Sequence, residues 1–169
     1  MSKNINNETP DDNKPLYILI ISIHGLIRGN NLELGRDADT GGQTKYVVEL
    51  AKALAKQPNV EQVDLITRLI VDAAVDADYG AVTEVLSENA QIVRIETGAK
   101  GYIPKEELWS HLDGFTDRLF DWLLSLPRLP DILHSHYADA GYVGVRLSHL
   151  TGLPLIHTCL LYTSPSPRD

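Results

Sequence analysis

Buried strands are the first elements that the hydrophobic pattern of this chain predicts. Residues 16–23 read LYILIISI, a run rich in β-branched side chains with no alternation of polar and apolar positions. Such a run is typical of a strand covered on both faces, as in a parallel sheet. Shorter strands are predicted over residues 62–68, 91–95 and 131–135, and a further apolar run covers residues 153–156.

Helices are predicted between these strands, over residues 41–56, 105–126 and 139–150. Apolar side chains recur at helical spacing in the first segment, prolines bracket the second, and Thr151-Gly152 ends the third. Residues 71–88 have no clear period, and we expect a loop with a short helix there. Strands that alternate with helices in this way predict an α/β fold with a doubly wound parallel sheet.

The two ends of the chain differ from this pattern. Residues 1–15 are polar and offer little to bury, so we expect a disordered leader. Residues 159–169 run into a Ser/Pro segment, in which Pro165 and Pro167 forbid a helix where a βα unit needs one. We therefore expect one Rossmann-like domain over residues 16–158 and a tail, 159–169, that does not belong to it.

Composition narrows the range of partners. The chain has 169 residues and a formal net charge of -8, which argues against nucleic acid because phosphate backbones need a basic surface. The single cysteine, Cys159, excludes an internal disulfide. The sequence shows neither the apolar core of a signal peptide nor an apolar run long enough to span a membrane. These features lead us to expect a cytoplasmic protein.

The loop after the first strand ends in a candidate ligand-binding turn. Its residues are Asp39-Thr40-Gly41-Gly42-Gln43, directly before a predicted helix. Paired glycines let the backbone approach a ligand closely, and free N–H groups in a first helical turn favour an anion. The alternative is an ordinary N-cap, in which Asp39 or Thr40 accepts hydrogen bonds from those N–H groups.

Two further loops leave the ends of predicted strands, where open α/β sheets bind ligands. In residues 98–105, Lys100 or Lys105 can supply positive charge to a phosphate, or both are ordinary solvated lysines. The other loop follows the strand at residues 131–135 and carries His134 and His136 at a spacing that some metal sites use. No third ligand is evident, so we expect no metal there and favour a histidine facing a polyol hydroxyl or a structural histidine.

Together these segments resemble the synthase domain of the sucrose-phosphate synthases. The resemblance is carried by HGLIRGNNLELGRDADTGGQ at 24–43, VDLITR at 63–68, YIPKEELW at 102–109 and LHSHYADAG at 133–141. It covers nearly everything between residues 16 and 158. It implies the N-terminal Rossmann-like domain of a retaining GT-B glycosyltransferase, without the second domain that holds the nucleotide sugar.

The family transfers glucose from UDP-glucose to fructose 6-phosphate, giving sucrose 6-phosphate and UDP in sucrose biosynthesis. The resemblance therefore implies these two small-molecule substrates as partners, with no membrane and no nucleic acid. It requires no cofactor and leaves room for Mg²⁺ as a family feature. A sucrose synthase that uses free fructose, and a non-catalytic sugar-phosphate-binding module, stay open as alternatives.

The resemblance also assigns site residues. Gly41 and Gln43 match positions that contact the acceptor sugar, and Gly42 matches the glycine that lets the donor phosphates approach. His136 and Asp139 match a strand-end motif of the acceptor site.

The lysine and the end of the chain depart from the family pattern. The family places a lysine directly before the aromatic position of Tyr102, where this chain has Gly101, so Lys100 is expected to reach the acceptor phosphate from one position earlier. After Thr158 the family continues with Gly-His-Ser-Leu-Gly, but this chain continues with Cys159-Leu-Leu-Tyr. The family histidine is thus replaced, no catalytic residue is assigned, and we expect this chain by itself to be inactive.

Overall fold

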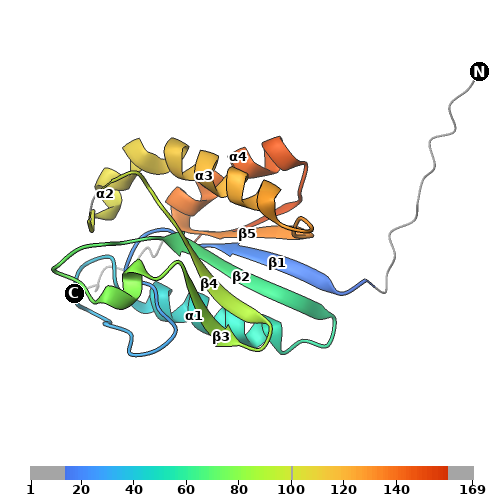
Figure 1. Cartoon of the computed structure of the whole chain (residues 1–169), viewed down its shortest axis with the longest axis horizontal. Coiled ribbons are helices and arrows are strands. Elements are labelled where there is room, and N and C mark those ends of the chain that lie inside the picture. The colour runs from blue at the N-terminus through green and yellow to red at the C-terminus, as the bar shows by residue number, and fades with distance from the viewer. Residues whose placement is uncertain (1–13, 100, 160–169) are drawn as a thin grey trace, which may run out of the picture.

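The computed structural model describes residues 14–99 and 101–159 of the chain. Six strands form one sheet with the order β3-β4-β2-β1-β5-β6 (Figure 1). Their bounds are β1 (Leu16–Ile21), β2 (Val60–Arg68), β3 (Thr83–Ser87), β4 (Ala90–Ile95), β5 (Ile132–His136) and β6 (Leu155–Thr158). All neighbouring pairs are parallel except β3 and β4, which are antiparallel.

Helices cover both faces of this sheet. They are α1 (Gly42–Ala55), α2 (Lys105–Leu108), α3 (Leu112–Ser125) and α4 (Tyr137–Thr151), with short 3-10 helices η1 (Ala77–Gly80) and η2 (Trp109–His111). The helix α1 packs on one face, and α3 and α4 lie together on the other (Figure 1). The predicted doubly wound α/β fold is therefore confirmed, with one antiparallel strand added at its edge. In the described part of the chain, no helix has the length and apolar character that crossing a membrane requires.

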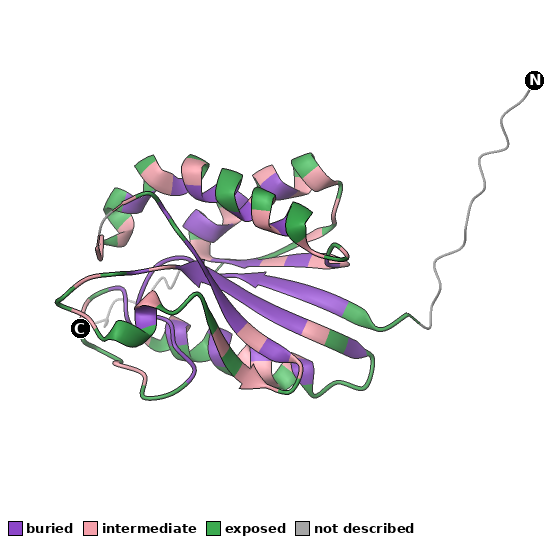
Figure 2. Ribbon diagram, in the orientation of Figure 1, coloured by how far each residue is buried: buried purple, intermediate pink, exposed green. Residues whose placement is uncertain are grey.

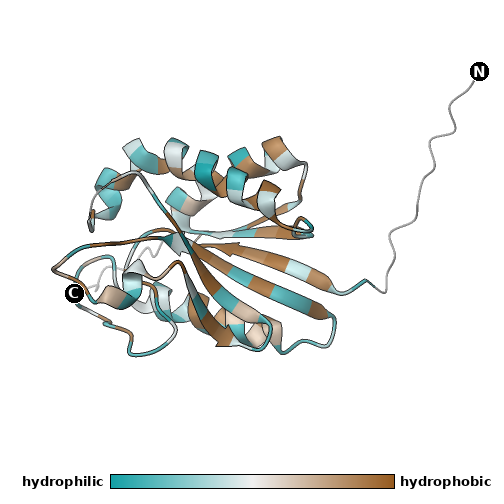
Figure 3. Ribbon diagram, in the orientation of Figure 1, coloured by the Kyte–Doolittle hydropathy of each residue, from teal (hydrophilic) through white to brown (hydrophobic). Residues whose placement is uncertain are grey.

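The sheet separates two apolar cores. On the α1 face, Val47 and Val48 pack with strand residues such as Leu65. On the opposite face, Phe115 and Val143 pack against another set of strand side chains. Because both faces are covered, β1 is buried and apolar beyond its first residue, and β2 is buried beyond Gln62 (Figures 2 and 3). This double burial explains why residues 16–23 show no alternation in the sequence.

Two elements differ from the sequence-based expectation. The segment 71–88 contains the expected short helix, η1, but also β3, which pairs with β4 as an edge strand. The side chains of β3 are exposed or only half-buried, so its sequence carries no strong apolar signal. The predicted helix over residues 105–126 is divided into α2, η2 and α3. At this division the Ser110 hydroxyl donates to the Glu107 carbonyl, a local bond that competes with regular helix geometry.

The connections define where a ligand can enter. The chain leaves β1 for α1 on one face of the sheet and leaves β5 for α4 on the other face. Because β1 and β5 are direct neighbours, the loops after these two strands diverge from a common point. Open α/β sheets bind ligands in the crevice at such a point, outside the carboxyl ends of the strands.

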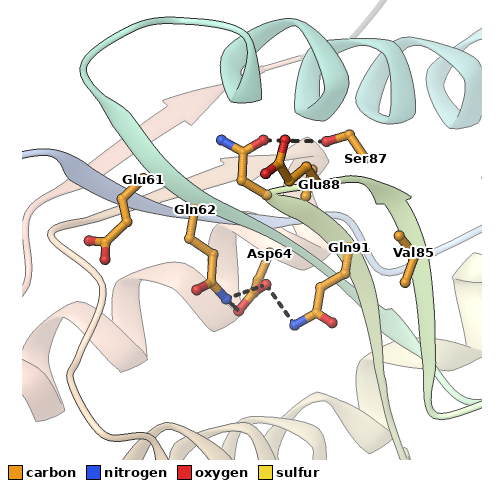
Figure 4. A pocket seen from close by; sticks show the side chains of 9 residues that line it. Glu61, Gln62, Asp64, Val85, Ser87, Glu88 and Gln91 are labelled. Atoms are coloured by element: carbon orange, nitrogen blue, oxygen red, sulfur yellow. Dashed lines mark hydrogen bonds between the residues drawn. The ribbon is translucent and has the colours of Figure 1, made fainter.

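A polar cluster lies at the other end of the sheet, near the start of β2 and β4 (Figure 4). Its centre is Asp64, a fully buried carboxylate that accepts hydrogen bonds from the amides of Gln62 and Gln91 and from the Tyr17 hydroxyl. Burial and the neighbouring Asp64 raise the pKa of Tyr17, which keeps the hydroxyl protonated as a donor. These donors satisfy both carboxylate oxygens. We therefore assign this cluster a structural role.

Candidate functional site

A cavity of about 570 Å³ lies at the carboxyl ends of the strands. It is lined by His24, Ala38, Asp39, Gly41, Gly42, Gln43, Tyr46, Lys105 and Tyr137. These residues come from the loop after β1, the beginning of α1, the beginning of α2 and the beginning of α4. The structure thus brings together parts of all three loops that the sequence indicated.

The glycine turn at the start of α1 opens into this cavity. Gly41 is the N-cap of α1 and forms no side-chain capping bond. The side chain of Thr40 instead accepts from the Leu26 N–H at 3.1 Å, and Asp39 accepts from the Lys105 N–H at 2.8 Å. The alternative of an ordinary N-cap by Asp39 or Thr40 is therefore wrong. The N–H groups of the first turn of α1 have no capping side chain, which suits an anionic or hydroxyl-bearing ligand.

The turn is held by contacts within the loop. One oxygen of Asp37 accepts from the backbone N–H groups of Asp39 and Thr40, at 2.9 and 2.8 Å. Although burial opposes ionisation, the side chain of Thr40 and then these two N–H groups lower the pKa of Asp37 below its ordinary value. Gly25 adopts a φ of +79°, and a Cβ there would lie 2.5 Å from the Asp39 carbonyl oxygen. The loop can pass this close to the turn only because residue 25 is glycine.

His24 and Asp139 join the two sides of the cavity. The Nδ1 atom of His24 lies 2.9 Å from Oδ2 of Asp139, and each side chain is only 4% exposed. The ring of Tyr137 packs edge-on against His24, with 4.5 Å between the ring centroids. His24 follows β1 and Asp139 lies in the first turn of α4, so this pair bridges the point where the two connections diverge. Asp139 was expected at the site from the sequence, whereas His24 and Tyr137 were not.

His136 lies beneath this region and does not line the cavity. It is fully buried, and neither ring nitrogen has a hydrogen-bond partner among the described residues. Burial, followed by the neighbouring His134 and His157, lowers the pKa of His136 to about 4. The ring centroids of His134 and His136 are 4.2 Å apart. The described residues nevertheless contain no group of three side chains arranged to hold a metal ion.

Lys105 is the cation that the structure places at the cavity. Its Nζ lies 3.2 Å from Oδ1 of Asp39, and this contact raises the pKa of Lys105. Both Lys100 and Lys105 were candidates from the sequence, and the resemblance assigned Lys100. Lys100 lies outside the described residues.

Arg68, at the end of β2, is a buried charge that the sequence analysis did not single out. It is 2% exposed, its guanidinium has no hydrogen-bond partner among the described residues, and its Cζ lies 4.7 Å from the centroid of the Tyr102 ring. Burial lowers the pKa of Arg68, while the charges of Asp39 and Asp139 oppose this shift. No local pattern distinguishes this residue, because its environment comes from loops distant in sequence.

The unpartnered buried side-chain atoms gather at this end of the sheet. Such atoms occur in Thr67, Arg68, Arg94 and His136 of the described chain, and Oδ1 of Asp39 accepts no hydrogen bond although it forms an ion pair with Lys105. All these residues lie at or beyond the carboxyl ends of β1, β2, β4 or β5. Buried polar groups without partners are rare in folded proteins, and each of them needs a structural or functional explanation. Of these residues, only Asp39 lines the cavity itself.

Comparison with known proteins identifies relatives of this chain. Residues 41–168 match the family model of the glycosyl transferase 4-like domain. Sucrose-phosphate synthase 4 of Arabidopsis thaliana is 43% identical over 90% of this chain and 16% of its own length. A probable sucrose-phosphate synthase 4 of Oryza sativa subsp. japonica is 46% identical over 86% of this chain and 16% of its own length. The chain therefore spans about a sixth of the length of these relatives.

Solved structures give the same fold. The sucrose-phosphate synthase of Thermosynechococcus elongatus superposes with a TM-score of 0.68 and 26% identity, over 85% of this chain and 33% of that chain. Os79 of O. sativa, solved in complex with UDP, superposes with a TM-score of 0.52 and 13% identity, over 83% of this chain and 28% of that chain, and shows likeness of fold alone. The Rossmann-like domain of a GT-B glycosyltransferase and the resemblance to sucrose-phosphate synthases are both confirmed. The chain belongs to the family of glycosyl transferase 4-like domains.

Proposed function

We propose that the intact protein transfers glucose from UDP-glucose to fructose 6-phosphate and that this chain forms the acceptor side of its active site. The observation that carries this proposal is the cavity at the start of α1, where the uncapped Gly41–Gln43 turn faces Lys105. The sucrose-phosphate synthases among the relatives supply the substrate class.

The proposed roles follow from the positions of the residues. Gly41 and Gln43 contact the acceptor sugar through the beginning of α1, while Gly42 leaves space for the phosphates of the donor. A Cβ at Gly41 or Gly42 would meet no heavy atom of the described residues within 4 Å, so their surroundings are open for a ligand. Gln43 also donates to the Ser22 hydroxyl at 3.1 Å, which holds its side chain beside the end of β1.

The acceptor phosphate needs positive charge near the same cavity. Lys105 provides it, and Lys100 remains the second candidate that the resemblance gives. An ammonium group binds phosphate as a point charge without strict geometry, so either lysine can serve. His136, which the resemblance places among the acceptor-binding residues, is fully buried at the end of β5 and does not line the cavity of the free chain.

The chemistry of the intact protein depends on two bound substrates. Holding donor and acceptor in reacting geometry can lower such a barrier by roughly 7–11 kcal/mol. The resemblance places the donor on a second domain, and this chain spans 16% of the length of its plant relatives. We therefore expect the 169-residue chain to bind the acceptor but to form no sucrose 6-phosphate.

Calorimetric titration of the chain with fructose 6-phosphate, fructose, inorganic phosphate and UDP-glucose tests the proposal. We expect fructose 6-phosphate to bind more tightly than fructose, because Lys105 contributes only to the phosphate ester. Equal binding of the two would favour a site for free fructose. Absence of fructose 6-phosphate binding by the folded chain contradicts the proposal, and sucrose 6-phosphate formed above a blank contradicts the expected inactivity.

A further inference from the structure

The His24–Asp139 pair has the geometry of an oriented hydrogen-bonding group at the cavity. Asp139 uses both carboxylate oxygens: Oδ1 accepts from the Ala140 N–H at 2.8 Å, and Oδ2 faces Nδ1 of His24 at 2.9 Å. With both oxygens engaged and the side chain only 4% exposed, Asp139 has little capacity to bind a ligand directly. The group that reaches the cavity from this pair is the imidazole of His24.

The contact with Asp139 fixes the tautomer of the imidazole. A carboxylate accepts hydrogen bonds, so Nδ1 of His24 carries the proton in this pair. In the neutral ring Nε2 is then an acceptor, and it forms no hydrogen bond with the described residues. An acceptor of this kind binds the O–H of an alcohol, and it does not suit a phosphate oxygen, which brings no proton at neutral pH.

The backbone of Tyr137 supports this arrangement. Tyr137 has a φ of +74°, a left-handed conformation that costs a residue with a side chain about 1–2 kcal/mol. Strain of this kind persists where the surrounding structure requires it, and it gathers at functional sites. Here it turns the chain between β5 and α4 so that the Tyr137 ring packs on one side of His24 while Asp139 holds Nδ1.

We propose that His24 binds a hydroxyl group of the acceptor sugar through Nε2, and that Asp139 is a positioning residue that acts through His24. This inference rests on the proposed function, since it takes the ligand of the cavity to be a sugar. According to this inference, the residue that contacts the acceptor sugar at this side of the cavity is His24 and not Asp139. The site then binds the ligand through two kinds of contact: a cation binds the phosphate, and a neutral hydrogen-bond acceptor binds a hydroxyl group.

Nitrogen-15 NMR of the histidine rings in the full 169-residue chain tests the arrangement without any substitution. In the free protein we expect His24 to be protonated at Nδ1 and unprotonated at Nε2. Addition of fructose 6-phosphate should shift the Nε2 resonance of His24 and leave that of the exposed His149 unchanged. A proton on Nε2 in the free protein, or no shift of His24 at saturating sugar phosphate, overturns the inference.

His24→Asn tests the same point by affinity, because the shorter amide can still donate to Asp139 but has no atom at the position of Nε2. We expect roughly tenfold weaker binding of fructose 6-phosphate, the effect of one hydrogen bond. Inorganic phosphate should bind with unchanged affinity. His149→Asn is the matched control and should bind both ligands like the parent chain.

Asp139→Asn provides a second variant. An asparagine can donate its N–H to Nδ1, which moves the ring proton to Nε2 and removes the acceptor. We expect weaker sugar phosphate binding together with an inverted nitrogen-15 pattern for His24, a spectroscopic change that a loss of packing alone does not produce. Far-ultraviolet circular dichroism identifies any variant that fails to fold, and the ring resonances of the unsubstituted chain then decide.

The outcomes separate the inference from the proposed function. If the parent chain binds fructose 6-phosphate and His24→Asn binds it equally well, the inference fails and the proposed function stands. If the folded parent chain does not bind fructose 6-phosphate, the proposed function fails and the inference fails with it.

Discussion

Lys105 contacts both carboxylate oxygens of Asp39. Its backbone N–H donates to Oδ2 at 2.8 Å, and its Nζ lies 3.2 Å from Oδ1. The beginning of α2 is thereby attached to the turn that precedes α1, although the two residues are far apart in the sequence. The backbone contact remains when the side chain is shortened, so the charge of Lys105 can be removed without releasing the turn.

Lys105→Met should weaken the binding of fructose 6-phosphate by roughly 10-fold or more, because one charged hydrogen bond to phosphate is lost. The binding of fructose should change little, since fructose carries no phosphate. Calorimetric titration with both sugars measures the difference. Lys56→Met, at the exposed far end of α1, is the control and should leave both affinities unchanged. Equal loss for the two sugars would show that Lys105 shapes the turn rather than binding the phosphate.

Gly25→Ala should destabilise the chain by about 2–5 kcal/mol, the combined cost of a left-handed alanine and of overpacking. The added Cβ would lie 2.5 Å from the Asp39 carbonyl oxygen and 2.8 Å from a methyl group of Thr44. Gly35→Ala is a matched control, because Gly35 has a φ of +80° but no heavy atom within 4 Å of such a Cβ. We expect about 1–2 kcal/mol for this control. Urea unfolding of both variants gives the comparison, and equal losses would disprove the close approach at Gly25.

Tyr17→Phe should lower the free energy of unfolding by about 1.5–3 kcal/mol, since the buried Asp64 carboxylate loses a hydroxyl donor. The binding of sugar phosphate should stay unchanged, because this cluster lies away from the cavity at the carboxyl ends of the strands. Tyr46→Phe removes a hydroxyl that has no hydrogen bond to the described residues and serves as the stability control. A loss of stability no larger than that of the control would argue against a structural role for the Asp64 cluster.

The buried His136 should make the stability of the chain depend on pH. Its pKa is about 4 in the folded chain, against 6.5 for an ordinary histidine, so the unfolded chain binds a proton that the folded chain does not. Stability is therefore complete above about pH 6.5 and falls as the pH decreases toward 4, with a loss on the order of 3 kcal/mol. Urea midpoints across this range measure the effect. His136→Leu should reduce the slope, and an unchanged slope would mean that other groups cause the pH dependence.

Much of the fold could be predicted from the sequence because buried segments show characteristic patterns of apolar residues. The unbroken apolar run at residues 16–23 indicated a strand covered on both faces, and β1 is such a strand. The helical spacing of residues 41–56 likewise matched α1. The strand β3 was missed because an edge strand with exposed side chains has no apolar pattern, and its pairing with β4 is a contact between chain segments.

The candidate site was predicted only in part. Sequence motifs indicated the Gly41–Gln43 turn and Asp139, and the resemblance gave them expected roles. The turn lines the cavity, and those roles stay predictions. The partner of Asp139 is His24, which lies 115 positions earlier in the chain. Arg68 was not anticipated either, because only its contact with Tyr102, from a loop distant in sequence, distinguishes it from other arginines at strand ends.

The sequence by itself determined the buried strands, the helices that pack on them and the loops that carry polar groups, because periodicity and apolar runs are local properties of the chain. It did not determine the edge strand β3 or the division of the segment 105–126. Only the tertiary structure decided which polar groups meet. The pairing of β1 with β5 brings His24 to Asp139, and the position of α2 brings Lys105 to Asp39. The physical reason is that hydrogen bonds and ion pairs act over a few ångströms, so their partners are set by strand order and loop path rather than by neighbours in sequence.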